Sequence, residues 1–143
     1  MLIVKSGKDL EQLLAFSLSD PPFIPRPMIH VIAQPRIENS ALEEKIFAQL
    51  EEDSVEARIA GLATPALIVW GAEDRVIDVA TADVLRNLLP HSKCIIMPDI
   101  GHMPMFESPQ QSAADYLRFR EPLQKGELPR QEACQVEGRA GAR

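Results

Sequence analysis

The chain has 143 residues, 45% of them hydrophobic and 25% charged, with a formal net charge of −6 at pH 7. This length and composition are typical of an ordinary globular domain with room for one core. An acidic chain without a basic stripe is a poor match for a nucleic-acid-binding protein, so we expect no nucleic acid partner. No apolar run approaches the roughly 20 residues of a transmembrane helix, and no transmembrane segment is predicted.

The first residues and the cysteine content indicate a cytoplasmic protein. The apolar run that follows Met1 is too short for the core of a signal peptide. The 2 cysteines are Cys94, in a predicted buried strand, and Cys134, in a polar tail, so we expect no disulfide and a reducing compartment. The sequence therefore favours a cytoplasmic location.

The beginning of the chain is predicted to be helix and loop, interrupted by prolines. Ser6 is placed to cap a first helix, with Asp9 in its first turn, and Pro21-Pro22 ends that helix. A short second helix is expected over residues 28–33, stopped by the following Gln34-Pro35, because proline cannot continue a helix without losing a hydrogen bond.

A third helix is predicted from a capping box. Ser40 and Glu43 have the spacing at which each side chain satisfies a backbone amide of the other's residue. The apolar stripes of these three helices have no obvious cover among themselves. We therefore predict that residues 1–60 form a helical cap that lies on another part of the fold.

Residues 61–121 change to an alternating pattern of strands and helices, which indicates an α/β fold. Strands are predicted over residues 66–70 and 93–97, and helices over about 79–89 and 109–120. The first strand is apolar throughout, as strands buried on both faces of a parallel sheet are. A helical crossover joins parallel neighbours, so this segment is predicted to be a βαβα unit. We expect its first strand to need further neighbouring strands that the chain does not encode.

The last segment, residues 122–143, is rich in Gln, Glu, Arg, Gly and Ala and has no apolar periodicity. Such a composition cannot bury enough apolar surface to order itself, so we predict a disordered tail.

An acid and a histidine follow the two predicted strands. Asp74 comes shortly after the first strand, and His102 follows the second and is preceded by Gly101. Functional groups of open α/β sheets gather beyond the carboxyl ends of the strands, so both side chains are expected at one edge. Singly, each has an ordinary explanation, as a turn aspartate or a surface histidine. Together they match the acid and base of a nucleophile–His–acid triad.

Other carboxylates near this pair are predicted to have structural roles. Asp78 lies on the same loop, but Asp74 is closer to the strand end, and Asp78 is expected to cap the next helix. Asp99 is predicted to be a solvated turn residue, and Glu107 a residue favoured by the dipole at the start of the last helix. No histidine has metal-ligand spacing with the pair, so no metal is predicted.

The segments Leu67-Ile-Val-Trp-Gly-Ala-Glu-Asp74 and Ile100-Gly-His-Met-Pro-Met-Phe-Glu-Ser-Pro109 resemble the C-terminal section of the α/β-hydrolase fold. In that family a Trp-Gly-x-x-Asp pattern supplies the triad acid, and a Gly-His pair after the last strand supplies the base. The resemblance is closest to the lipase and monoacylglycerol-lipase branch. It implies that Asp74 and His102 are catalytic and that the substrate is a small apolar carboxylic ester, with no cofactor. It also implies that Met103 and Phe106 line an acyl-binding pocket.

The family's nucleophile motif, Gly-x-Ser-x-Gly, is absent from this chain, as is the loop that supplies the oxyanion hole. We therefore expect a C-terminal portion of a hydrolase, with the N-terminal half of the fold missing and no activity alone. Dehalogenase and epoxide hydrolase remain alternatives to lipase or esterase, because an aspartate nucleophile would also suit the pair. A non-catalytic alternative is a module that docks on an N-terminal hydrolase half or self-associates through its strand edge and cap.

Overall fold

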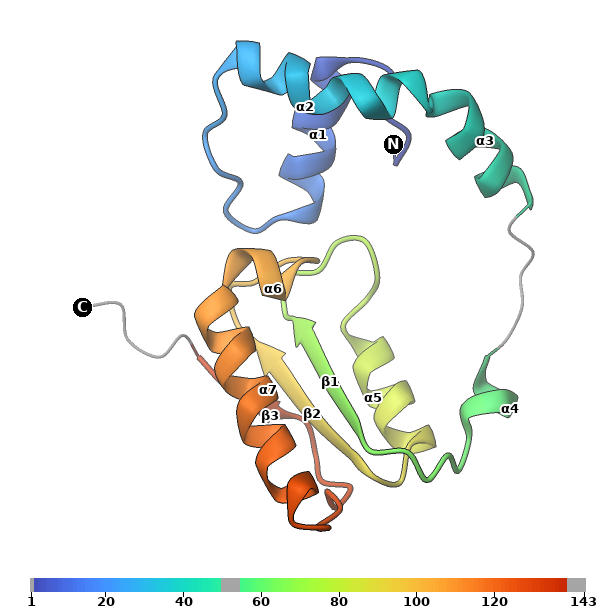
Figure 1. Cartoon of the computed structure of the whole chain (residues 1–143), viewed down its shortest axis with the longest axis vertical. Coiled ribbons are helices and arrows are strands. Elements are labelled where there is room, and N and C mark those ends of the chain that lie inside the picture. The colour runs from blue at the N-terminus through green and yellow to red at the C-terminus, as the bar shows by residue number, and fades with distance from the viewer. Residues whose placement is uncertain (1, 50–54, 139–143) are drawn as a thin grey trace.

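The computed structural model describes residues 2–49 and 55–138. It has an α/β architecture, in which helices α1 to α3 lie beyond the ends toward which β1 and β2 point (Figure 1). Its elements are, in chain order, α1 (Gly7–Ser17), α2 (Arg26–Glu38), α3 (Ser40–Gln49), α4 (Glu56–Ile59), β1 (Ala66–Gly71), α5 (Ala80–Leu88), β2 (Ser92–Met97), α6 (Pro104–Glu107), α7 (Pro109–Gln124) and β3 (Gln135–Val136).

The sheet has the order β1-β2-β3, and both neighbouring pairs are parallel. Its register pairs Ile68 with Cys94, and these two residues form a buried cluster with Ala82 of α5. Side chains alternate along a strand, so Ile95 and Met97 face the other way, where they form a second cluster with Ile100. The predicted pair of parallel strands is thus confirmed, and each face of the sheet has a buried cluster of its own.

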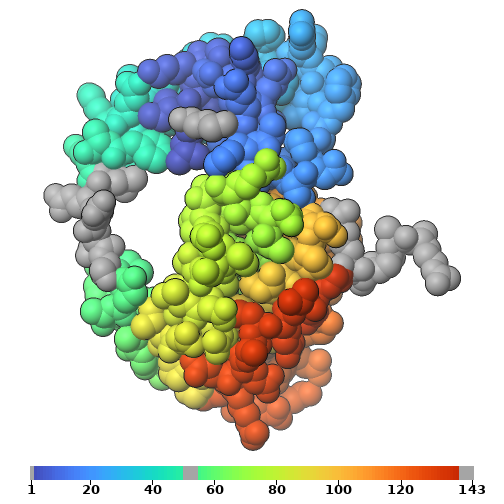
Figure 2. All heavy atoms as spheres, turned by 180° about the vertical axis from the view of Figure 1, so that it is seen from behind, coloured from blue at the N-terminus to red at the C-terminus, as the bar shows by residue number. Residues whose placement is uncertain are grey.

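The N-terminal helices have a small core of their own. The Asp9 amide donates to Ser6 Oγ at 3.2 Å, which confirms Ser6 as the cap of α1. Val4, Leu10 and Ile29 are buried together with Ala33 between α1 and α2. In the space-filling view the blue region that includes α1 lies against the green segment that follows β1 (Figure 2). No helix in residues 2–49 or 55–138 is long and apolar enough to cross a membrane.

The predicted short helix over residues 28–33 is wrong, because α2 continues through Pro35 to Glu38. A proline inside a helix costs about 3 kcal/mol, since it removes one backbone hydrogen bond. Burial of Ile29 and Ala33 on the same helix offsets this cost. The Pro35 carbonyl itself stays hydrogen-bonded, because it accepts from both the amide of Asn39, at 3.2 Å, and its side chain, at 2.7 Å.

The predicted capping box at Ser40 is also wrong. Ser40 lies within α3 and its hydroxyl donates to the Ile37 carbonyl at 2.8 Å. The Glu43 carboxylate instead accepts two hydrogen bonds from Arg36, at 3.1 and 3.0 Å. A cation on the preceding helix competes better for a carboxylate than a neutral amide does, which decides the partner.

The prediction of a disordered tail from residue 122 is wrong for the part that the structure describes. Helix α7 ends at Gln124, and β3 adds to the free edge of β2, with Gln135 opposite Ile95. A disulfide joins Cys94 to Cys134, so the expectation of no disulfide is wrong as well. The argument for a reducing compartment no longer holds, because it depended on unpaired cysteines. Residues 139–143 lie outside the described part.

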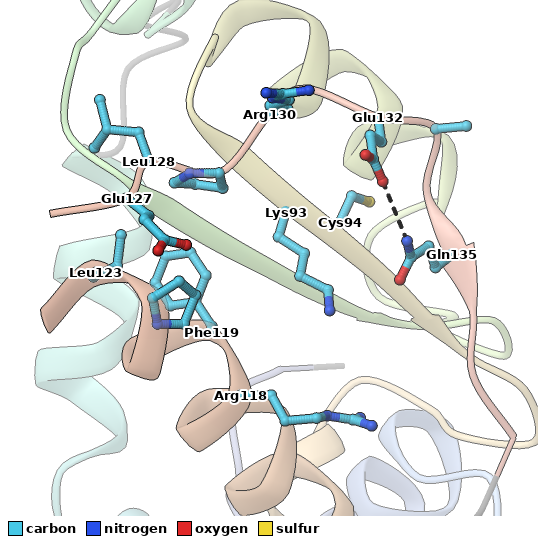
Figure 3. Close-up of a pocket in the computed structure, with 13 residues that line it drawn as sticks. Lys93, Cys94, Arg118, Phe119, Leu123, Glu127, Leu128, Arg130, Glu132 and Gln135 are labelled. Atoms are coloured by element: carbon cyan, nitrogen blue, oxygen red, sulfur yellow. Dashed lines mark hydrogen bonds between the residues drawn. The ribbon is translucent and has the colours of Figure 1, made fainter. Parts of the chain in front are cut away.

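The folded-back tail, α7 and the start of β2 line an open cavity of about 240 Å³ (Figure 3). Lys93 reaches into it from the start of β2, and Phe119 lines it from α7. Lys93 is near the amino end of its strand, whereas the predicted acid and histidine follow the carboxyl ends. This cavity therefore lies at the opposite end of the sheet from the predicted site.

Candidate active site

Asp74 and His102 meet at the carboxyl edge of the sheet. Gly71, the last residue of β1, pairs with Met97, the last residue of β2, so the loops that follow the two strands start side by side. His102 Nδ1 lies 2.9 Å from Asp74 Oδ2. The structure thus brings together the two residues that the sequence singled out, and it does so at the edge where the sheet topology predicts them.

The Asp74 carboxylate is fixed by its own loop. Its Oδ1 accepts hydrogen bonds from the amides of Val76, at 2.8 Å, and Ile77, at 3.0 Å. The side chain is only 3% exposed. Burial raises the pKa of Asp74, but hydrogen bonds from His102, Ile77 and Val76 outweigh it, so the pKa lies below its ordinary value of 3.8. The group is therefore an ionised acceptor at neutral pH.

An ionised carboxylate has no proton to donate, which determines the tautomer of a neutral His102. Its Nδ1 must carry the hydrogen that Asp74 Oδ2 accepts, so its Nε2 is left with a free lone pair. The His102 side chain is 36% exposed, so the ring is only partly covered by the fold. The pair can act as a general base whose imidazolium form the carboxylate would stabilise.

The loops carrying the two residues approach one another at the level of the backbone. The amides of Ala72 and Glu73 donate to the carbonyls of Met97 and Ile100, each at 2.9 Å. A Cβ on Gly71 would lie 2.0 Å from the Gly101 carbonyl oxygen, so the approach requires glycine. The loops that carry the acid and the base are consequently held side by side by direct backbone contacts.

Glu107 is the site residue that sequence reasoning assigned to a different role. It ends α6, and its carboxylate accepts hydrogen bonds from Gly101 and from Ser19, a residue of the segment that follows α1. The expected interaction with the dipole of the last helix is therefore not its main one. Its closeness in sequence to Gly101-His102 was the only available signal, because its partner Ser19 is remote in sequence.

The remaining predicted residues have separate positions. Asp78 accepts a hydrogen bond from the Ala80 amide at 2.8 Å, which confirms its capping role at α5. Asp99 is an exposed turn residue with a φ of 58°, as expected of a solvated turn. Met103 and Phe106 are 38% and 56% exposed and flank the histidine loop, and their acyl-binding role stays a prediction. Within the described residues, no serine or cysteine side chain hydrogen-bonds to the imidazole.

Comparison with known proteins places these features in a family. The chain matches the model of the alpha/beta hydrolase fold over residues 25–109. It is 39% identical over 127 residues to Lipase 3 of Moraxella sp. (strain TA144), covering 87% of this chain and 40% of the lipase. It is 24% identical over 100 residues to monoacylglycerol lipase ABHD6 of Mus musculus, covering 67% of this chain and 30% of that protein.

A solved structure has a similar fold. The crystal structure of a membrane phospholipase A, described as a novel bacterial virulence factor, superposes with a TM-score of 0.80 at 32% identity, covering 86% of this chain and 40% of that one. The chain thus spans about 40% of the length of Lipase 3 and of this phospholipase. The family model covers more than half of the chain and includes both Asp74 and His102. The chain belongs to the α/β-hydrolase fold family, and its similarity lies with the lipases of that family.

Proposed function

We propose that this chain supplies the acid and the base of a carboxylic ester hydrolase that acts on small apolar, acylglycerol-like esters. The observation that carries the proposal is the 2.9 Å hydrogen bond from His102 to a buried, ionised Asp74 at the carboxyl edge of the sheet. Similarity to Lipase 3 and to a monoacylglycerol lipase supports the choice of substrate class. Asp74 is the triad acid in this proposal and His102 the base.

In the proposed mechanism, a serine hydroxyl supplied by another segment attacks the ester carbonyl carbon. His102 Nε2 takes the hydroxyl proton and then gives it to the departing alcohol, while Asp74 stays ionised and stabilises the imidazolium. Water then attacks the acyl-enzyme, with His102 again as base, and releases the carboxylic acid and the free serine. Each half-reaction returns His102 to its neutral form.

The chain alone is expected to be inactive. No serine in it has the flanking glycines of the family's nucleophile elbow. Without a nucleophile there is no acyl-enzyme, and without an oxyanion hole nothing stabilises the charge that develops on the carbonyl oxygen. Turnover of a nitrophenyl ester by the isolated chain that His102→Ala abolishes would overturn this expectation.

A chimera tests the proposed function directly. In it, the matched 127-residue segment of the Moraxella Lipase 3 is replaced by the corresponding residues of this chain. Hydrolysis of nitrophenyl esters of increasing acyl length is then measured. We expect activity that falls about 10⁴-fold in Asp74→Asn and about 10⁶-fold in His102→Ala.

Asp78→Asn is the matched control in that chimera, because this carboxylate lies on the same loop but caps α5. It should leave activity within a few-fold of the parent chimera. A folded chimera that hydrolyses no ester, or one whose activity survives His102→Ala, would contradict the proposal.

A second candidate is a module that docks on an N-terminal hydrolase half. Two observations favour it: β1 has a strand neighbour on one side only among the described residues, and α3 buries none of its residues. Leu42, Ile46 and Phe47 on α3 are 56%, 50% and 42% exposed. Sedimentation and thermal unfolding of the isolated chain test this candidate. A monodisperse monomer that melts cooperatively would argue against such a surface.

A further inference from the structure

We propose that Glu107 is a positioning residue for His102, because its carboxylate fastens the histidine loop to the segment that follows α1. This inference rests on the proposed function, since positioning has a catalytic consequence only if His102 is the base. It assigns a role in the site to the segment of residues 17–19, which precedes the sheet in the sequence and was expected to belong to the cap.

The backbone amides around the histidine are all held. Glu107 Oε1 accepts from the amide of Gly101 at 2.9 Å and from that of Met103 at 3.3 Å. The amide of His102 itself donates to the Ser17 carbonyl at 2.7 Å. Three consecutive amides therefore have partners outside their own loop backbone, which fixes the backbone position from which the imidazole reaches Asp74.

The second oxygen of the carboxylate reaches across to Ser19. Glu107 Oε2 accepts from both the amide and the hydroxyl of Ser19, each at 2.7 Å. The same hydroxyl lies 2.6 Å from the carbonyl of Asp99, and because it has a single proton the two acceptors share it. Ser19 thus contacts both Asp99, which precedes the histidine, and Glu107, which follows it.

The packing around Gly101 leaves no room for a side chain. A Cβ on Gly101 would lie 2.5 Å from the Ser17 carbonyl oxygen, 2.9 Å from the Ser19 amide and 3.0 Å from Glu107 Oε1. Real Cβ atoms do not come that close to backbone atoms, so the absence of a side chain at this position is what allows the contact. The segment after α1 is consequently pressed directly against the histidine loop.

The charge of Glu107 strengthens these bonds. Burial raises its pKa, but the hydrogen bonds from Ser19, Gly101 and Met103 outweigh burial, so the pKa lies below its ordinary value of 4.5. The group is ionised at neutral pH and accepts only, and bonds to an ionised acceptor are roughly twice as strong as neutral ones. A glutamine has the same shape but turns one acceptor into a donor that faces the donors of Ser19 or of the loop.

The test reads the His102 ring in the full chain, without any ester. The nitrogens are labelled with ¹⁵N, and two-dimensional spectra are recorded at pH 9, well above the ordinary imidazole pKa of about 6.5. In the parent chain we expect one His102 tautomer, with hydrogen on Nδ1 and a downfield Nδ1–H proton. Glu107→Gln should lose the downfield proton and give a mixture of tautomers, because the ring is no longer held against Asp74.

Glu121→Gln is the matched control, since this exposed carboxylate of α7 pairs only with Lys125, at 2.9 Å, among the described residues. It should leave the His102 signals unchanged. Ser19→Ala removes one donor and should broaden or partly shift the same proton. A folded Glu107→Gln chain with the parent tautomer would overturn the proposal. If that variant does not fold, unchanged His102 signals in Ser19→Ala would overturn it.

This outcome is independent of the ester chemistry. A chimera that hydrolyses nothing would refute the proposed function while the tautomer signals of the chain still report whether Glu107 positions the ring. Conversely, an active chimera combined with unaltered signals in Glu107→Gln would refute the positioning role alone.

Discussion

Gly71 and Gly101 lie in such close contact that a Cβ on the first would be 2.0 Å from the carbonyl oxygen of the second. They are the residues that end β1 and precede His102, so their contact determines how closely the acid loop and the histidine loop approach. The Asp74–His102 hydrogen bond depends on this backbone contact as much as on the two side chains themselves.

We predict that Gly71→Ala destabilises the fold by about 3 kcal/mol or more, because the clash is with backbone and cannot be relieved by a side-chain rotation. Urea unfolding followed by circular dichroism measures the effect. Gly138→Ala is the control, since a Cβ there would meet its nearest neighbour, Pro98, at an ordinary 4.0 Å. Equal unfolding midpoints for the two variants would contradict the prediction.

The disulfide between Cys94 and Cys134 closes a loop with a sequence separation of 40. A loop of that length lowers the entropy of the unfolded chain by an amount that corresponds to about 4 kcal/mol of stability. Reduction should therefore lower the melting temperature. It should also expose the amide of Glu137, which donates to the Ile96 carbonyl at 3.0 Å, to exchange as β3 detaches.

The control for this prediction is Cys134→Ala, whose melting temperature should not respond to a reductant. Thiol counting on the native, unreduced chain provides the decisive measurement. Two free thiols in that sample would show that the disulfide does not form.

Stability should fall in acid because of Asp74 and Glu107. The pKa of each is lower in the folded chain than its ordinary value, 3.8 and 4.5 respectively, so the unfolded chain binds more protons in this range. The contribution is therefore fully present above about pH 5 and is lost as the pH falls through the depressed folded values.

Urea unfolding midpoints between pH 3 and pH 7 measure this dependence. Asp74→Asn and Glu107→Gln should each flatten the decline below pH 5, although both also lower stability at pH 7. Glu121→Gln, an exposed carboxylate on α7, should leave the slope as it is. A parent chain whose midpoint is constant down to pH 3 would contradict the assignment of these two carboxylates.

Arg75 joins the acid loop to the N-terminal helices. Its Nη2 donates to the carbonyls of Ala15 and Leu18, at 3.1 and 3.0 Å, at the end of α1. Hydrogen bonds from a charged donor contribute about 1.5–3 kcal/mol, so Arg75→Met should destabilise the chain by that order. Amide exchange should rise at the end of α1 and at His102, whose amide is bound to Ser17. Faster exchange confined to α5 would count against this link.

Much of the fold could be predicted because its signals are local. The apolar runs of β1 and β2, the Ser6 cap and the Asp78 cap each depend on residues within a few positions of one another. The closeness of Asp74 and His102 followed from topology, since adjacent parallel strands present their carboxyl ends at one edge. These expectations needed no knowledge of how distant segments pack.

The failures all concern contacts between distant segments or competition for one partner. Pro35 remains in a helix because the core between α1 and α2 outweighs its local penalty. Glu43 bonds to Arg36 rather than to the backbone, and Cys134 reaches Cys94 only because the tail finds the free edge of β2. No apolar periodicity within the tail predicts that it pairs with the edge of β2.

The sequence by itself determined the α/β class, the two parallel strands and the positions of the acid and the histidine, because periodicity and spacing encode secondary structure directly. Only the tertiary structure decided how His102 is held. Glu107 and Ser19 are 88 positions apart, and their bond exists because α1 ends against the histidine loop. Hydrogen-bond partners of a buried carboxylate are chosen by which donors packing brings within reach, and no local pattern contains that information.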